Sequence, residues 1–231
     1  MSKGPLSVRW LDWTLEPPQA GALVHARVEL QNDGTVAWRN GIRFGYHWLD
    51  ERGNALIWDS PRTDVPRLAP GERGFIDARI RAPIPPGRYR LSLDLVAELR
   101  AWFTELGGDP LDTLVDVAPR SDPVHAELPP WVLPSVDWAE RTAAAHAEGY
   151  GVVAGAIEWD GGMLHPRPHE LAAYRPGAGR IPGFTHALLC PSVVEGVELT
   201  RLPDVAGLPA FAAPGGEPWL YDGRIVLVAR P

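Results

Sequence analysis

The 231-residue sequence predicts a mainly β protein, with an antiparallel β-sandwich in its first half and a small α+β domain in its second half. Two observations carry this prediction. Short runs of alternating apolar and polar residues recur through the first half at intervals of roughly 8–12 residues, which is the strand spacing of a sandwich. The 24 Gly and 25 Pro residues fall between these runs without a fixed period, as is typical of a turn-rich β protein.

The strands of the first half are predicted from period-2 alternation, because successive side chains of a strand point to opposite faces. Residues 22–31 show the pattern most clearly, with Val24, Ala26 and Val28 on one face and polar residues between them. The turn residues Asn32-Asp33-Gly34 follow directly. The other strands are predicted at 6–15, 42–49, 55–58, 74–82, 88–96 and 112–117.

A Pro-rich stretch at residues 119–134 is predicted to be a semi-rigid linker between a domain at 1–118 and a second domain at 135–231. The second domain opens with the best helix signal of the chain, at 135–148, where a Ser or an Asp can cap the start and a Gly can end the helix. Beyond it, strands are predicted at 150–159, 187–189, 193–199 and 224–228, with a short helix at 170–174 and a turn at 221–223.

Composition and charge exclude several classes of partner. The net charge is −7 and the sequence has no run of Lys or Arg, so we expect no nucleic-acid partner. It also lacks a run of about 18 apolar residues, so we expect no membrane insertion. The single Cys190 excludes a disulfide framework. The first five residues lack the apolar core of a signal peptide, so we expect a cytoplasmic protein, and no cofactor is predicted.

Tryptophan is unusually abundant, with ten residues in the chain. Trp38 and Trp48 are expected in the core, where an indole buries a large apolar area. Other aromatic residues fit an inward register less well, and two exposed together would form a patch suited to a sugar face or a peptide. The residues predicted to bind a ligand are Trp13, Trp58, Trp102, Trp219 and Tyr221.

A catalytic site in the second half is the alternative to a binding surface. Glu158 and Asp160 lie two apart at a strand end, so they share one face and could act as acid and base. His165 and His169 have a spacing that suits a metal on a helix, but the prolines between them forbid a regular helix, so no metal site is predicted. If the chain is an enzyme, its catalytic residues are predicted to be Glu158, Asp160, His165, His169 and Asp222.

Three motifs in order carry a resemblance to a known family. Asn32-Asp33-Gly34-Thr35-(x2)-Trp38, then Pro70-Gly71-Glu72, then Ala82-Pro83-(x3)-Gly87-(x)-Tyr89 resembles the immunoglobulin-like "four-tryptophan" domain of selective-autophagy receptors and its bacterial relatives. Further features look more like the immunoglobulin-like domains attached to bacterial glycosyltransferases and other surface-glycan proteins; these are Gly45–Asp50, Arg62-Thr63, and Asp94-Leu95-Val96 with Trp102-Phe103.

The resemblance covers about residues 6–117 and implies an immunoglobulin-like sandwich that serves as a non-catalytic recognition unit. It transfers no catalytic residue. The long segment Ala97–Asp109 departs from the receptor pattern, so no peptide site is carried over. Residues 119–231 resemble no family known to us.

The sequence therefore predicts a binding or interaction protein rather than a catalyst. We expect it to recognise a glycan or a protein partner, with cell-envelope polysaccharide metabolism as one setting. Two alternatives stay open: a small glycan-processing enzyme with its site in the second half, and a structural subunit of a larger assembly. The sequence does not specify the oligomeric state.

Overall fold

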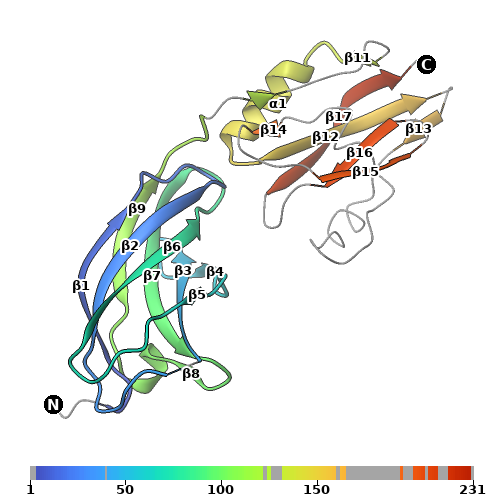
Figure 1. Cartoon of the computed structure of the whole chain (residues 1–231). Coiled ribbons are helices and arrows are strands. Elements are labelled where there is room, and N and C mark those ends of the chain that lie inside the picture. Colours follow the sequence, from blue (N-terminus) through green and yellow to red (C-terminus); the bar gives the residue numbers. More distant parts are fainter. Residues whose placement is uncertain are drawn as a thin grey trace. The chain divides into compact units, whose positions relative to one another are not determined.

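The computed structural model describes residues 4–39, 41–121, 124–125, 132–159, 162–164, 193–194, 200–205, 208–212 and 218–229. The chain divides into two compact units (Figure 1). The first comprises Met1–Gln19 and Leu23–Ala118, and the second comprises Ala20–Ala22 and Pro119–Pro231. Both units are built mainly from β-strands.

One sheet of the first unit has three antiparallel strands in the order β1-β2-β6. They are β1 (Val8–Leu15), β2 (Leu23–Asn32) and β6 (Arg73–Arg81). Apolar residues pair across β2 and β6 on the buried face, for example Ala26 with Ala78 and Val28 with Ile76. The alternation seen in residues 22–31 therefore predicted the inward face of β2 correctly.

The other sheet is built on two long central strands, β3 (Ile42–Leu49) and β7 (Gly87–Ala97), which pair antiparallel. Two short strands pair with the free edge of β3, namely β4 (Ala55–Ile57) and β5 (Thr63–Asp64). Two further strands pair with the other edge of β7, namely β8 (Ala101–Trp102) and β9 (Leu111–Val117).

The core lies between the two sheets. Phe44, Tyr46 and Trp48 of β3 pair with leucines of β7, and all of these side chains are buried. Two hydrogen bonds tie this sheet to the end of β6: the Trp48 Nε1–H donates to the carbonyl of Arg81 (2.9 Å), and the Arg81 N–H donates to the Tyr46 hydroxyl (2.9 Å). Trp38 and Trp48 are both buried, as the sequence predicted.

The strand order identifies the sandwich type. Three strands β1-β2-β6 against β4-β3-β7-β9 correspond to the A-B-E and C′-C-F-G sheets of immunoglobulin-like domains. At the start of β7 the Tyr89 hydroxyl donates to the carbonyl of Pro85 (2.6 Å), which is the tyrosine-corner contact of such sandwiches. The first unit is therefore an immunoglobulin-like β-sandwich.

Asn32 joins two of the motifs that the sequence singled out. Its side-chain amide donates to the carbonyls of Val36 and Leu68 (both 2.9 Å), and its side-chain oxygen accepts from the N–H of Gly34 (3.0 Å). Its backbone carbonyl accepts from the N–H of Gly71 (2.7 Å). The fully buried Asn32 thus holds the turn after β2 against the Pro-Gly turn before β6.

In the part that the structure describes, the second unit contains a mixed sheet in the order β11-β17-β12-β13 and the helix α1 (Trp138–Ala147). The central strands β12 (Val152–Trp159) and β17 (Trp219–Ala229) run parallel. The remaining strands are β10 (Val124–His125), β11 (Val132–Pro134), β13 (Gly162–Leu164), β14 (Val193–Val194), β15 (Thr200–Val205) and β16 (Leu208–Ala212).

Several predictions for the second half can be compared with these elements. The predicted helix and the predicted strand at 150–159 are present as α1 and β12. The turn predicted at 221–223 is wrong, because residues 222–225 form a bulge inside the continuous strand β17, between the pairs Ala154–Tyr221 and Ala156–Val226. The elements predicted at 170–174 and 187–189 lie outside the described residues. The linker role of 119–134 and the α+β class stay predictions.

Candidate functional site

The outward face of the β3–β7 sheet carries a cluster of aromatic and polar side chains. Because alternate residues of β3 point into the core, Gly45 and His47 point outward, opposite Asp94 and Ser92 of β7. Side chains from the loops beside β4 and β8 cover this part of the face. We call the group the Trp58 cluster; it consists of His47, Trp58, Arg62, Asp94 and Trp102.

Trp58 lies flat on the imidazole of His47. The two ring centroids are 4.1 Å apart and the ring planes are inclined by 20°. The Nδ1–H of His47 donates a hydrogen bond to the Trp58 carbonyl, so His47 contacts both the ring and the backbone of Trp58. Trp58 is nevertheless 53% exposed, which is what an indole retains when one face is covered and the other is open.

The edge strand β4 has an irregular register on β3, because Trp48 pairs with Ile57 and Leu49 with Ala55, which leaves Leu56 as an extra residue. Trp58 follows directly, in the stretch between β4 and β5, and stacks on the outward-facing His47. In this stretch, side-chain hydrogen bonds take the place of backbone pairing between strands. The N–H of Tyr46 donates to the Ser60 hydroxyl (2.8 Å), and His47 donates to the Trp58 carbonyl. Bulged edge strands re-aim side chains in this way and also block unwanted strand pairing.

Trp102 packs beside the same histidine. Its ring meets His47 edge-on at a centroid distance of 4.3 Å and lies over Gly45, where an added Cβ would come within 2.8 Å of the indole. Only a residue without a side chain leaves room for this ring at position 45. Trp102 is 9% exposed, because the guanidinium of Arg62 lies 4.5 Å above its ring.

Arg62 is anchored on several sides. It donates to the carbonyl of Ser60 (2.6 Å) and forms ion pairs with Asp59 and with Glu98 (3.5 Å). Its charge is thus balanced by two carboxylates at the rim of the cluster, and its position over Trp102 is determined by those contacts.

Asp94 and His47 are buried beneath the rings, at 1% and 4% exposure. Asp94 accepts hydrogen bonds from the Thr104 hydroxyl (2.7 Å) and from the N–H of Leu95 (2.7 Å), while burial raises the pKa of its carboxyl. Burial also lowers the pKa of His47, which disfavours the imidazolium form. Neither group has the access to solvent that proton transfer to a substrate needs. The contacts of His47 instead hold the Trp58 indole in place on the surface of the sheet.

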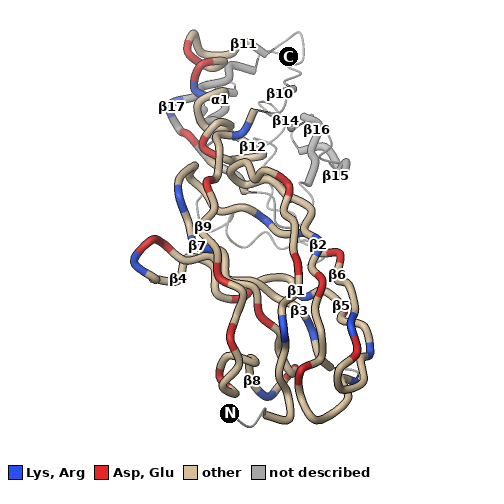
Figure 2. Tube along the Cα trace, turned by 90° about the vertical axis from the view of Figure 1, so that its left-hand side faces the viewer, with Lys and Arg blue, Asp and Glu red and all other residues tan. Residues whose placement is uncertain are grey.

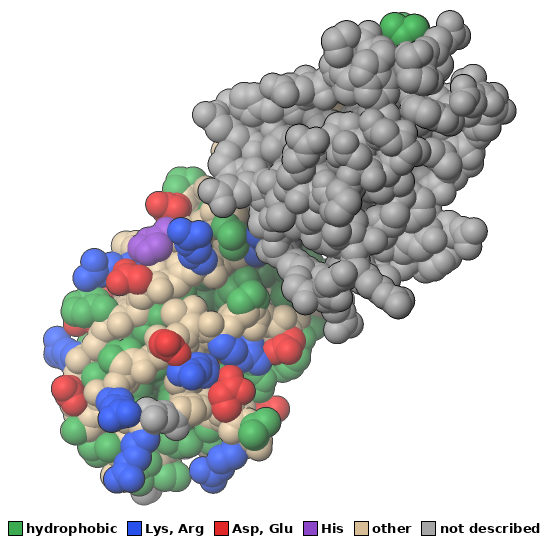
Figure 3. Space-filling model, turned by 45° about the vertical axis from the view of Figure 1, so that its right-hand side comes forward, with side chains coloured by type: hydrophobic (Ala, Val, Ile, Leu, Met, Phe, Trp, Pro, Cys, Tyr) green, Lys and Arg blue, Asp and Glu red, His purple; other side chains and the backbone are tan. Residues whose placement is uncertain are grey.

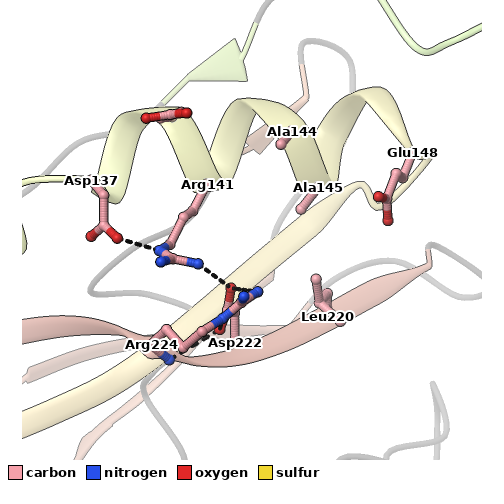
Figure 4. A pocket seen from close by; sticks show the side chains of 9 residues that line it. Asp137, Arg141, Ala144, Ala145, Glu148, Leu220, Asp222 and Arg224 are labelled. Atoms are coloured by element: carbon pink, nitrogen blue, oxygen red, sulfur yellow. Dashed lines mark hydrogen bonds and ion pairs between the residues drawn. The ribbon is translucent and has the colours of Figure 1, made fainter.

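A second concave site lies within the second unit, between α1 and β17. It is a cavity of about 310 Å³ in which Arg141 of α1 points toward Asp222 of β17 (Figure 4). Arg141 pairs with Asp137 and with Asp222 (3.7 Å), and Arg224 pairs with Asp222 at 2.8 Å. The hydrogen bond from Arg224 lowers the pKa of Asp222, so this carboxylate stays ionised and paired.

The structure brings together only some of the residues predicted to bind a ligand. Trp58 and Trp102 meet through His47, whereas Trp13 lies on β1 in the other sheet, half-buried on the core side opposite Val28. Trp219 and Tyr221 lie on β17 in the second unit.

The predicted catalytic residues are spread over the second half. Glu158 lies on β12 and Asp222 on the neighbouring strand β17, while Asp160, His165 and His169 lie outside the described residues. Their catalytic use, like the use of the aromatic residues, stays a prediction.

Sequence reasoning did not identify His47, Arg62 and Asp94 as members of the site. The alternation along β3 places His47 outward and could have identified it. Arg62 and Asp94 stand in motifs that carried the family resemblance, but only the irregular edge of the sheet and the β3–β7 register bring them to His47.

Charges are mixed over the first unit. Acidic and basic residues are interspersed over its strands and loops (Figure 2), and both signs lie among hydrophobic side chains on the face seen in Figure 3. Among the described residues no three His, Cys, Asp or Glu side chains gather as a metal site. In the same part of the chain, no helix is both long and apolar enough to cross a membrane.

Comparisons with known proteins yield partial structural matches only. No protein-family model and no curated protein matches the chain. The C-terminal domain of wzt matches 53% of this chain and 78% of its own at 11% identity and a TM-score of 0.38. A CARDB domain from Pyrococcus furiosus covers 51% of this chain and 97% of its own, with 17% sequence identity and a TM-score of 0.30. Spo0M of Bacillus subtilis, a sporulation control protein, covers 49% of this chain and 49% of its own, with 17% sequence identity and a TM-score of 0.32. All three TM-scores are below 0.5, so the fold rests on the strand order.

Proposed function

We propose that this protein is a non-catalytic binding protein whose first unit recognises a glycan or a protein partner through the Trp58 cluster. One observation carries the proposal: Trp58 is 53% exposed although its ring is stacked flat on a buried histidine. A large exposed aromatic side chain held in one orientation is characteristic of a recognition surface.

The way the ring is held supports this role. Binding orders side chains and thereby loses free energy, on the order of 0.5–1.5 kcal/mol for each side chain that is immobilised. Here His47 already immobilises Trp58, and the core strand β3 supports His47 from below. A ligand that meets Trp58 therefore meets a preorganised surface.

The chemistry of the buried groups favours binding over catalysis. His47 and Asp94 are enclosed, and Asp222 in the second unit is ionised and paired with two arginines. The resemblance of residues 6–117 to immunoglobulin-like domains of surface-glycan proteins agrees with a recognition role, and cell-envelope polysaccharide metabolism is the setting that we propose.

The test uses the full 231-residue chain on a glycan array and on a peptide array. Three proteins are compared: the parent, Trp58→Ala and Phe75→Ala. Phe75 is the matched control because it is an aromatic residue of equal exposure, 52%, on the other sheet. Binding on either array that Trp58→Ala abolishes and Phe75→Ala retains supports the proposal. Binding that is equal for the parent and Trp58→Ala on both arrays contradicts it.

A further inference from the structure

We propose that the ligand of the Trp58 cluster is an uncharged glycan, with one pyranose ring lying on the open face of Trp58. This inference rests on the proposed function, and it adds the chemical class of the ligand and the sign of charge that the site rejects.

The shape of the platform favours a ring. The indole of Trp58 is flat, fixed from below by His47 and open on its other face. A flat apolar surface of one indole matches the face of a pyranose on which the C–H groups project, and a few polar groups placed around such a surface orient the ligand.

The apolar area is small. Leu56 lies two residues before Trp58 at the edge of the sheet, and the two side chains are 50% and 53% exposed. The next charged residues along the chain are Asp59 and Arg62, which pair with each other beside Trp58. A stable protein interface buries about 800 Å² on each partner, with charged residues depleted at its centre. The surface around Trp58 suits a sugar better than a protein.

The rim supplies hydrogen-bonding groups for hydroxyls. Asp59 follows Trp58 in the chain and is well exposed, and Glu98 pairs with Arg62 at 3.5 Å. Farther along β3, Arg43 pairs with the exposed Asp64. Arg43 lies four residues from His47, which is about 13 Å at 3.3 Å per residue. The polar row is therefore long enough to meet successive rings of an oligosaccharide.

The balance of charge selects an uncharged ligand. The rim holds three carboxylates, Asp59, Asp64 and Glu98, against two guanidinium groups, Arg43 and Arg62, and both arginines are already in ion pairs. An acidic sugar would bring a further negative charge to a site whose two described rim cations, Arg43 and Arg62, are already paired. Placing like charges together opposes binding, whereas neutral hydroxyls can donate to the carboxylates.

The experiment titrates the full chain with matched oligosaccharides of equal length: hexamers of mannose, galactose and N-acetylglucosamine against hexamers of mannuronate and galacturonate. A glycan array identifies other neutral and acidic glycans, and the peptide array is run in parallel. We expect Trp58-dependent binding of neutral glycans, weakened at least tenfold in Trp58→Ala and unchanged in Phe75→Ala. Asp59→Lys, which reverses one rim charge, is expected to raise the relative affinity for acidic glycans several-fold.

The outcomes separate this inference from the proposed function. Acidic glycans that bind as well as or better than their neutral counterparts overturn the inference and leave the proposed function standing. Trp58-dependent binding of peptides alone has the same consequence. If neither array shows any binding that depends on Trp58, both proposals fail. The urea unfolding midpoint of each variant is measured first, so that loss of binding is compared only among folded proteins.

Discussion

The imidazole of His47 lies directly against the indole of Trp58, with ring centroids 4.1 Å apart. Position 47 is on the outward face of a central strand, yet its side chain is as enclosed as a core residue because Trp58 and Trp102 cover it. The sheet thus carries a small second layer of packing on its outer face, and this layer holds the exposed ring in place.

His47 gives the stability of the first unit a dependence on pH. Burial lowers the pKa of His47 below its ordinary value of 6.5, so the unfolded chain takes up a proton more readily than the folded protein. The contribution of His47 to stability is therefore complete above about pH 6.5 and decreases as pH falls from 6.5 to the lowered folded pKa. We expect His47→Asn to lose less stability than the parent between pH 7.5 and 5.0 in urea unfolding followed by Trp fluorescence. An identical loss in both proteins contradicts this prediction.

Asn32→Ala is expected to destabilise the first unit strongly. The substitution leaves the carbonyls of Val36 and Leu68 and the N–H of Gly34 without their partner at a buried site, at a cost of about 2–4 kcal/mol. The control is Gln31→Ala, which removes an exposed hydrogen bond to the Gly71 carbonyl and should cost less than about 1 kcal/mol. Equal urea midpoints for the two variants would show that Asn32 does not join the turns as described.

Gly45→Ala is expected to displace Trp102. The new Cβ would lie 2.8 Å from the indole, and the ring cannot yield easily because His47 and Arg62 hold it. Overpacking of this kind costs about 1–3 kcal/mol. Gly87→Ala is the control, since its Cβ would meet Tyr89 at an ordinary 3.5 Å. A red shift of Trp emission with a lowered unfolding midpoint in Gly45→Ala alone is the expected result, and parent-like emission would refute it.

Arg141→Gln is expected to loosen α1 in the second unit. Arg141 is the cation that joins the helix to Asp222 of β17, and its side chain is 29% exposed. Hydrogen exchange of the amides in α1 should become roughly fivefold faster, which corresponds to about 1 kcal/mol. Arg224→Gln should leave exchange in α1 nearly unchanged, because Arg224 is 73% exposed and pairs with Asp222 within its own strand. Equal acceleration in both variants would contradict the bridging role of Arg141.

Much of the first unit could be predicted because its sequence patterns are local. Alternation along residues 22–31 and 42–49 determines which side chains face the core, and Asn32-Asp33-Gly34 marks the turn between strands. In the second half, turn chemistry at Tyr221-Asp222-Gly223 misled the prediction. Asp222 does accept from the N–H of Arg224 (3.0 Å), as in a turn, but pairing with β12 keeps the chain extended on both sides of the bulge.

The sequence by itself determined the faces of the strands and the abundance of aromatic residues, because period-2 alternation and composition depend only on neighbouring residues. It did not determine which Trp residues meet on the outward face of the sheet, where Trp58 is exposed and Trp102 is covered. Trp58 and Trp102 are 44 positions apart, and Trp13 has similar chemistry but lies on the core side of the other sheet. The tertiary structure made that choice, since the register of β3 on β7 and the irregular edge formed by β4 and the chain after it set which side chains converge on His47. Such pairings depend on hydrogen bonds between distant segments, which no local pattern of residues specifies.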